Sequence, residues 1–198
     1  MTKEAQHKEF WEWFKENNGA LVPDKISDDL QKSVDVWMSK LNIPAWEIGP
    51  FTEKPPLSFF AFSPSGDIET FEMSKSITAA APEIEGWIFL AAKPPKKWNR
   101  KFLWSRNEIE IDASNWKFLI YKYDDGLSDI VLIDDVLPNM KLEEKKRIVD
   151  FVVESEIGEI GMLTKVYSTD IDTNIDKELR LSATPLTEIK DVLNEKAS

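Results

Sequence analysis

The chain has 198 residues, with 25 Lys and Arg against 36 Asp and Glu, and its formal net charge is −11. A surface of that sign repels nucleic acid and anionic lipid at long range, so a protein is the expected macromolecular partner and nucleic acid is disfavoured. The sequence contains no cysteine and one histidine, His7, which excludes disulfides and Cys-ligated zinc and argues against a Ser-His-Asp triad; we expect no metal and no cofactor.

Two helices are predicted first in chain order. Phe10, Trp13 and Phe14 follow a spacing of three and four residues, which predicts a helix from Glu4 to about Asn17 that buries these rings. Ser27 is a candidate N-cap for a second helix. The apolar residues of that helix also recur at helical spacing: Leu30, Val34, Trp37, Met38 and Leu41. We expect His7 to be an exposed residue of the first helix.

Short strands follow these helices. Residues 45–51 alternate in polarity and residues 57–63 are nearly all apolar, so both predict strands. The Pro and Gly of the next turn predict a hairpin whose return strand is 68–73. A short helix that stops near Pro82 and a buried strand at 86–92 complete the first half.

The second half has a similar order of predicted elements. It contains three strands, a helix, a strand and a closing helix, at 109–111, 115–123, 128–136, 141–154, 161–171 and 184–196. Gly158 is expected to end the long helix and to admit a close chain crossing. Thr184 and Pro185 are expected as the cap and first residue of the closing helix.

Each half therefore has the order strand, strand, helix, strand, at 57–91 and 115–171. We predict an α+β fold in which two such halves form antiparallel or mixed sheets with helices packed on one side, preceded by two N-terminal helices. The chain is expected to form one α+β domain over 1–198. Within it, the halves 1–92 and 107–198 would be joined by a basic linker, 93–106.

Several segments carry a pattern. It comprises an F-W-x-W-F opening, a strand ending in S-x-x-G, an A-P-x-x-x-x-W-x-h-x-A-x-[KR]-P core and a late G-E. The matching positions are Phe10, Trp11, Trp13, Phe14, Ser63, Gly66, Ala81, Pro82, Trp87, Ala91, Lys93, Pro94, Gly158 and Glu159. Over roughly residues 9–163 the chain resembles a family of bacterial proteins of unknown function. The resemblance implies a fold that continues across both halves, and it implies no activity, cofactor or catalytic residue.

A basic and aromatic segment lies in the middle of this acidic chain. No acidic residue occurs between Gly86 and Asn107. The partner-binding candidates are Lys93, Lys96, Lys97, Trp98, Arg100, Lys101 and Trp104. Interleaved cations and rings suit an acidic protein, and they also occur in single-strand nucleic-acid sites. Of these interpretations we favour a solvated connecting loop, with an acidic protein partner as the next and nucleic acid as the last. Beyond Lys93, the four cations at 96, 97, 100 and 101 are expected to be exposed.

Acidic clusters offer few sites. Residues 170–178 resemble a calcium loop, but Ile175 replaces the required glycine and Leu181 replaces the bidentate glutamate. The pairs at 124–125 and 134–135 are interpreted as turn residues. Glu159 is expected to bridge backbone amides at the chain crossing.

The functional prediction is a cytoplasmic, tryptophan-rich bacterial binding or regulatory protein, adaptor-like or inhibitor-like, with a macromolecular partner. We expect no membrane association, because no apolar run approaches the length of a membrane helix. The alternative is a hydrolase-type enzyme that uses carboxylates without metal or cofactor. Carboxylates with shifted pKa values in a pocket would favour the enzyme, and a flat exposed aromatic patch would favour binding.

Overall fold

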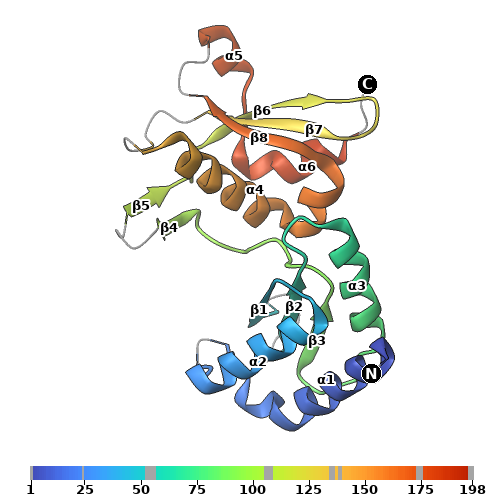
Figure 1. The fold of residues 1–198 in the computed structure, drawn as a ribbon. Coiled ribbons are helices and arrows are strands. Elements are labelled where there is room, and N and C mark those ends of the chain that lie inside the picture. Colours follow the sequence, from blue (N-terminus) through green and yellow to red (C-terminus); the bar gives the residue numbers. More distant parts are fainter. Residues whose placement is uncertain are drawn as a thin grey trace. The chain divides into compact units, whose positions relative to one another are not determined.

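The chain folds into two compact units, Met1–Pro94 and Pro95–Ser198, in a computed structural model (Figure 1). The structure describes residues 2–23, 25–51, 57–104, 109–133, 137, 140–172 and 176–195. Both units contain helices and a mixed sheet, and the chain begins with two helices, so the predicted α+β class is confirmed. The division falls between Pro94 and Pro95, and residues 95–104 of the expected linker therefore belong to the second unit.

The first unit opens with the two predicted helices, α1 (Lys3–Asn17) and α2 (Asp28–Leu41), with a short 3-10 turn, η1 (Asn18–Ala20), after α1. Side-chain caps begin both helices, because Thr2 accepts a hydrogen bond from the Ala5 amide and Ser27 accepts one from the Leu30 amide. Asn42, at φ 56°, closes α2 in the left-handed conformation.

Three strands and one helix complete this unit: β1 (Ala45–Pro50), β2 (Ser58–Ser63), α3 (Ile68–Ala79) and β3 (Trp87–Leu90). β1 is antiparallel to β2, and β3 is parallel to β2. The predicted return strand at 68–73 was wrong. Asp67 accepts a hydrogen bond from the Thr70 amide at 2.6 Å and caps α3, so the turn leads into a crossover helix instead of a hairpin.

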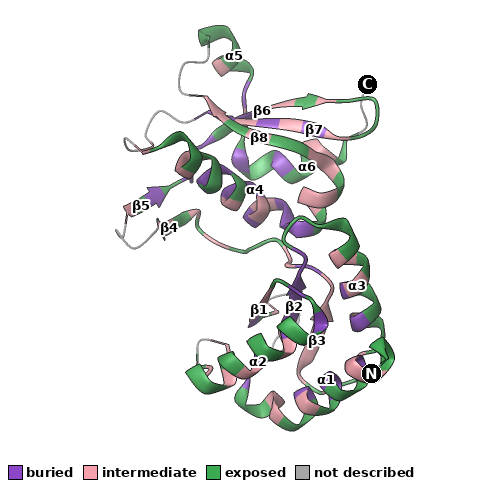
Figure 2. Cartoon of the chain, viewed as in Figure 1, coloured by how far each residue is buried: buried purple, intermediate pink, exposed green. Residues whose placement is uncertain are grey.

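An aromatic cluster fills the core of the first unit. Phe10 and Phe14 are fully buried, as predicted, whereas Trp13 is only partly buried. The Phe14 ring packs edge-to-face on Phe60, with ring centres 5.3 Å apart. It also meets Trp87 at 5.1 Å. The aromatic side chains of α1 therefore pack against the sheet of this unit. Figure 2 shows the buried residues in purple.

The second unit contains a two-stranded sheet, a four-stranded sheet and four helical segments. Its elements are β4 (Lys101–Trp104), β5 (Ile109–Asp112), β6 (Lys117–Lys122), β7 (Ser128–Ile133), α4 (Leu142–Lys165), β8 (Val166–Asp172), α5 (Lys177–Ser182), β9 (Thr184–Pro185), η2 (Leu186–Glu188) and α6 (Ile189–Asn194). The larger sheet has the order β8-β7-β6-β9, with β7 antiparallel to β6 and parallel to β8. The predicted helix start at 184 was wrong, because Thr184 and Pro185 pair with β6 before α6 begins.

Helix α4 is longer than predicted and is kinked. Gly158 has φ 75° and ψ 166°, a conformation that essentially only glycine adopts, and the helix resumes beyond it to Lys165. The glycine therefore interrupts the helix, as expected, but the chain does not leave it. The predicted strand at 161–171 consequently begins only at Val166.

The two units share one connectivity. The order β1-β2-α3-β3 in the first matches β6-β7-α4-β8 in the second, with an antiparallel hairpin followed by a parallel crossover in both. The order predicted for 57–91 was wrong, because that range holds a strand, a helix and a strand. The order strand, strand, helix, strand occurs in the first unit only when β1 is included, and it occurs in the second unit as predicted. In the second unit, α4 and α6 lie on the same side of the larger sheet (Figure 1).

Candidate functional site

The basic and aromatic segment packs against helix α4. The Lys96 amide donates to the Ser155 carbonyl at 2.7 Å, and the Lys96 ammonium lies 5.3 Å from the centre of the Phe151 ring. Lys96 and Lys97 are exposed, as predicted, whereas Lys93 in the first unit is half-buried. The two lysines are therefore exposed cations of the segment before β4.

The tryptophans of the segment line the core. Trp98 donates from Nε1 to Glu156 Oε1 at 3.0 Å. Its ring centre lies 5.6 Å from that of Phe151. Trp104 is also half-buried, with its ring centre 5.9 Å from Phe151. Because both rings pack against α4, neither forms a free stacking platform.

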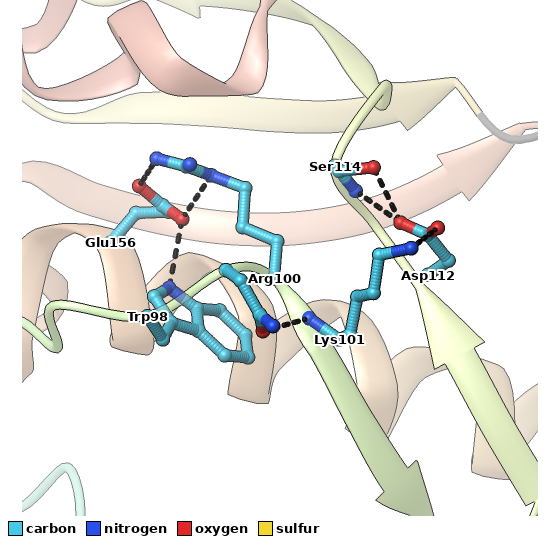
Figure 3. A network of polar contacts seen from close by, with 7 residues as sticks. Trp98, Arg100, Lys101, Asp112, Ser114 and Glu156 are labelled. Carbon is cyan, nitrogen blue, oxygen red and sulfur yellow. Dashed lines mark hydrogen bonds and ion pairs between the residues drawn. The ribbon is translucent and has the colours of Figure 1, made fainter.

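Arg100 was expected to be exposed, and this expectation was wrong. Its Nη2 donates to Glu156 Oε2 at 2.9 Å, and its Nε lies 2.8 Å from Oε1 (Figure 3). The Arg100 side chain is 22% exposed and that of Glu156 is 8% exposed. A largely buried carboxylate requires a partner of opposite charge, and Arg100 supplies it. The partner lies 56 residues away in sequence, so no local pattern could indicate it.

Lys101 also has an acidic partner, Asp112, at 2.8 Å across the β4–β5 pair. Hydrogen bonds from Lys101 and Ser114 hold the pKa of Asp112 far below its usual range. The same pair raises the pKa of Lys101. Two of the segment's candidate cations are thus neutralised within the second unit. The binding of an acidic partner by Lys96 and Lys97 remains a prediction.

The sequence interpretation missed a different aromatic surface, on the side of the larger sheet opposite α4 and α6. The chain has three tyrosines, and all lie there. Tyr121 on β6 stands opposite Asp129 on β7, and Tyr123 follows two residues later, so the two share a face. Tyr167 occupies the register shift between β7 and β8. The exposed fractions are 48% for Tyr121, 43% for Tyr123 and 72% for Tyr167.

Asp129 organises the centre of this surface. It accepts hydrogen bonds from the Tyr123 hydroxyl and, at 2.5 Å, from Ser168 Oγ. Both bonds lower the pKa of Asp129, Ser168 making the larger contribution. The bond to Asp129 in turn raises the pKa of Tyr123. The Tyr123 and Tyr167 rings meet edge-to-face at 6.1 Å.

We call this surface the tyrosine face; it comprises Leu119, Tyr121, Tyr123, Asp129, Val131, Tyr167 and Ser168. One signal for it was available in the sequence. Phe118 and Ile120 lie two residues apart in a predicted strand and so share one side of it, and Phe118 is fully buried. Alternation then places Leu119, Tyr121 and Tyr123 on the opposite side. What alternation cannot indicate is whether another element covers that side.

The carboxylates considered for catalysis are dispersed. Asp125 accepts from the Leu127 amide within its own turn, at 3.0 Å, while Asp134 and Asp135 lie outside the described residues. Glu159 is 2% exposed, within α4. In the parts of the chain that the structure describes, local hydrogen bonds lower the pKa of three carboxyl groups, those of Asp67, Asp112 and Asp129.

The calcium-like loop is only partly described, because Asn174 lies outside the described residues. Asp170 is 3.7 Å from the Lys146 ammonium. Over the described parts of the chain, no cluster of three or more His, Cys, Asp or Glu side chains is arranged to hold a metal ion. No helix in these parts is long and apolar enough to cross a bilayer. Comparison with protein-family models, curated proteins and solved structures finds no significant match.

Proposed function

We propose that this is a cytoplasmic binding protein, adaptor-like or inhibitor-like, whose protein partner docks on the tyrosine face. The observation that carries the proposal is the gathering of three exposed side chains, those of Tyr121, Tyr123 and Tyr167, on one side of the larger sheet. Tyrosine supplies large contact area at a low cost in conformational entropy and is enriched at interfaces and among hot spots. A cysteine-free chain needs no oxidising compartment to fold, which suits the cytoplasm.

The partner we propose presents a basic surface. Asp129 is held in its charged form at the centre of the face, and Asp124 and Asp125 lie exposed in the turn at the same end of the sheet. The net charge of −11 adds a long-range field of the same sign. Complementary charge of this kind steers association and selects partners.

Binding is supported better than carboxylate catalysis. A general acid requires a carboxyl pKa raised towards neutrality. The resolved carboxyl shifts in the described parts of the chain are in the opposite direction, as exposed charged groups accepting hydrogen bonds would give. These groups are suited to hold charge and to orient neighbouring hydroxyls.

Site-specific photocrosslinking in native lysate tests the proposal. A benzophenone amino acid replaces Tyr167 in one variant and Leu103 in a matched control. Leu103 is 67% exposed on β4 of the same unit, away from the tyrosine face. We expect a discrete adduct with a basic protein from position 167, lost at high salt, and none from position 103. Equal labelling from both positions, or a discrete adduct from position 103 alone, contradicts the proposal.

A further inference from the structure

A concave surface lies in the first unit, between α1 and the C-terminal end of α3. It has a volume of about 430 Å³. Its lining residues are Glu4, His7, Lys8, Trp11, Glu12, Lys15, Ser76, Ala80 and Pro82. We call it the His7 groove. Its size is in the range of pockets that hold small molecules.

The His7 side chain is the feature that indicates a ligand site in the groove. The side chain is 8% exposed, contrary to the expectation of an exposed histidine. Its imidazole makes no hydrogen bond to any other residue that the structure describes. Among the described residues, the fully buried side-chain nitrogen and oxygen atoms that lack a hydrogen-bond partner do not include those of His7. The imidazole nitrogens are therefore reached from the groove that His7 lines, and they can pair with a ligand there. By contrast, the Trp11 indole in the same groove is satisfied, because it donates to the Ile77 carbonyl at 3.0 Å.

The groove indicates the charge of its ligand. The charged side chains at its rim are two acids and two bases: Glu4, Glu12, Lys8 and Lys15. Lys8 lies 3.9 Å from Glu12, one turn away. A rim of balanced charge favours neither an anion nor a cation. The wall between the rim residues is formed by Trp11, Ala80 and Pro82, which favour an apolar body.

His7 indicates the polar group that this ligand carries. Burial lowers the pKa of His7, and the nearby Lys3 ammonium lowers it further. The imidazole is then neutral at neutral pH and offers one donor and one acceptor. A hydroxyl can donate to the acceptor nitrogen or accept from the donor nitrogen, so it matches either tautomer.

We infer that the His7 groove binds a small, neutral aromatic molecule that carries a hydroxyl group. The ring lies against Trp11 and Pro82, and the hydroxyl pairs with the His7 imidazole. This site lies in the first unit and is independent of the tyrosine face.

Nuclear magnetic resonance tests the inference directly, because the chain has one histidine and so one pair of imidazole carbon signals. Phenol is titrated into the full chain, with toluene as the ring that lacks the hydroxyl. We expect a saturable shift of the His7 signals by phenol, with a dissociation constant of about a millimolar, and binding of toluene at least about tenfold weaker. N-acetyltyrosine amide, titrated in parallel, separates the sources of the ring: tighter binding than phenol points to a tyrosine side chain of a protein.

Two variants and a control keep the result interpretable. His7→Phe is expected to abolish the preference for phenol over toluene, measured by saturation transfer to the ligand. Ser76→Trp, at an exposed lining position, is expected to block both ligands. Gln31→Trp, at an exposed position on α2, is expected to bind like the wild type. Absence of a saturable His7 shift overturns the inference, and so does equal affinity for phenol and toluene or unchanged binding by Ser76→Trp.

Discussion

Arg100 and Glu156 form a two-point ion pair that fastens the segment after Pro95 to helix α4. Arg100 Nη2 donates to Glu156 Oε2 at 2.9 Å, Nε lies 2.8 Å from Oε1, and the same Oε1 accepts from Trp98 Nε1 at 3.0 Å. Glu156→Ala removes all three contacts and leaves a largely buried guanidinium without its partner. We expect a loss of about 3 kcal/mol in the free energy of unfolding, measured by urea denaturation.

The Lys101–Asp112 pair is the matched control for this prediction. It has a similar separation, 2.8 Å, but its side chains are 50% and 44% exposed. Solvent screens such a pair, so Lys101→Ala should change stability far less than Glu156→Ala. Equal losses of stability in the two variants would show that burial does not determine how much each ion pair contributes.

Phe14 and Trp13 are neighbours on α1 with different burial. Phe14 is fully buried against Phe60 and Trp87, whereas Trp13 is partly exposed. Phe14→Ala is expected to lower the free energy of unfolding by about 3–5 kcal/mol, and Trp13→Ala by clearly less. Deletion of residues 1–18 should expose the cluster and cause aggregation. A truncated chain that stays in solution and unfolds cooperatively would contradict the role of α1.

Gly158 tests the kink in α4. At φ 75° and ψ 166°, an L-residue is strained, so Gly158→Ala is expected to cost about 1–3 kcal/mol. Gly19→Ala is the control, since an added Cβ there meets open space at an ordinary φ. Thermal denaturation of the two variants measures the difference. A neutral Gly158→Ala variant would mean that the helix straightens at little cost.

His7 predicts a specific pH dependence. Burial, the larger cause, and the Lys3 charge lower its pKa below 6.5 in the folded chain, against a smaller opposing effect of Glu4. Between the lowered folded pKa and the unfolded value near 6.5, the unfolded chain binds more protons. The free energy of unfolding should therefore rise with pH through this window and fall on acidification. Histidine carbon signals give the folded pKa, and His7→Gln should remove this part of the stability change; a folded pKa above 6.5 would reverse the sign.

Local patterns predicted the helices α1 and α2 and the strands β1, β2 and β3, because apolar spacing and caps are local signals. The expectation that the third of these strands is buried was wrong, since every residue of β3 is only partly buried. The segment 68–73 was assigned wrongly because the Pro and Gly before it fit a hairpin turn, whereas Ile68 and Phe71 are three positions apart, as in a helix. The cap at Asp67 was the local signal for α3. β9 has two residues, and it forms because it pairs with Lys117 and Phe118 of β6. The two paired segments are far apart in the sequence, so no local pattern could predict that pairing.

The candidate sites depended even more on long-range contacts. The cations of the middle segment were visible in the sequence, but the partner that buries Arg100 was not. Conversely, Tyr123 and Tyr167 are 44 positions apart in the numbering, and they meet only through the β7–β8 pairing. Sequence alternation assigned the sides of β6. The exposure of the side that carries the tyrosines became recognisable only when the structure placed α4 and α6 on the other side of the sheet.

The central claim is that a basic protein partner docks on the tyrosine face, and its dissociation constant is the most direct test. The partner identified by crosslinking is titrated against wild type, Tyr121→Ser/Tyr167→Ser and Lys96→Glu/Lys97→Glu. The lysine variant is exposed at both positions but gives up the contact of Lys96 with the Phe151 ring, so it should lose about 1 kcal/mol of stability. We predict that the tyrosine variant weakens binding by about 2 kcal/mol or more, roughly thirtyfold, while the lysine variant binds at least as tightly as wild type. If the lysine variant instead associates slowly with a flattened salt dependence and the tyrosine variant binds normally, the partner uses the basic segment and the claim is wrong.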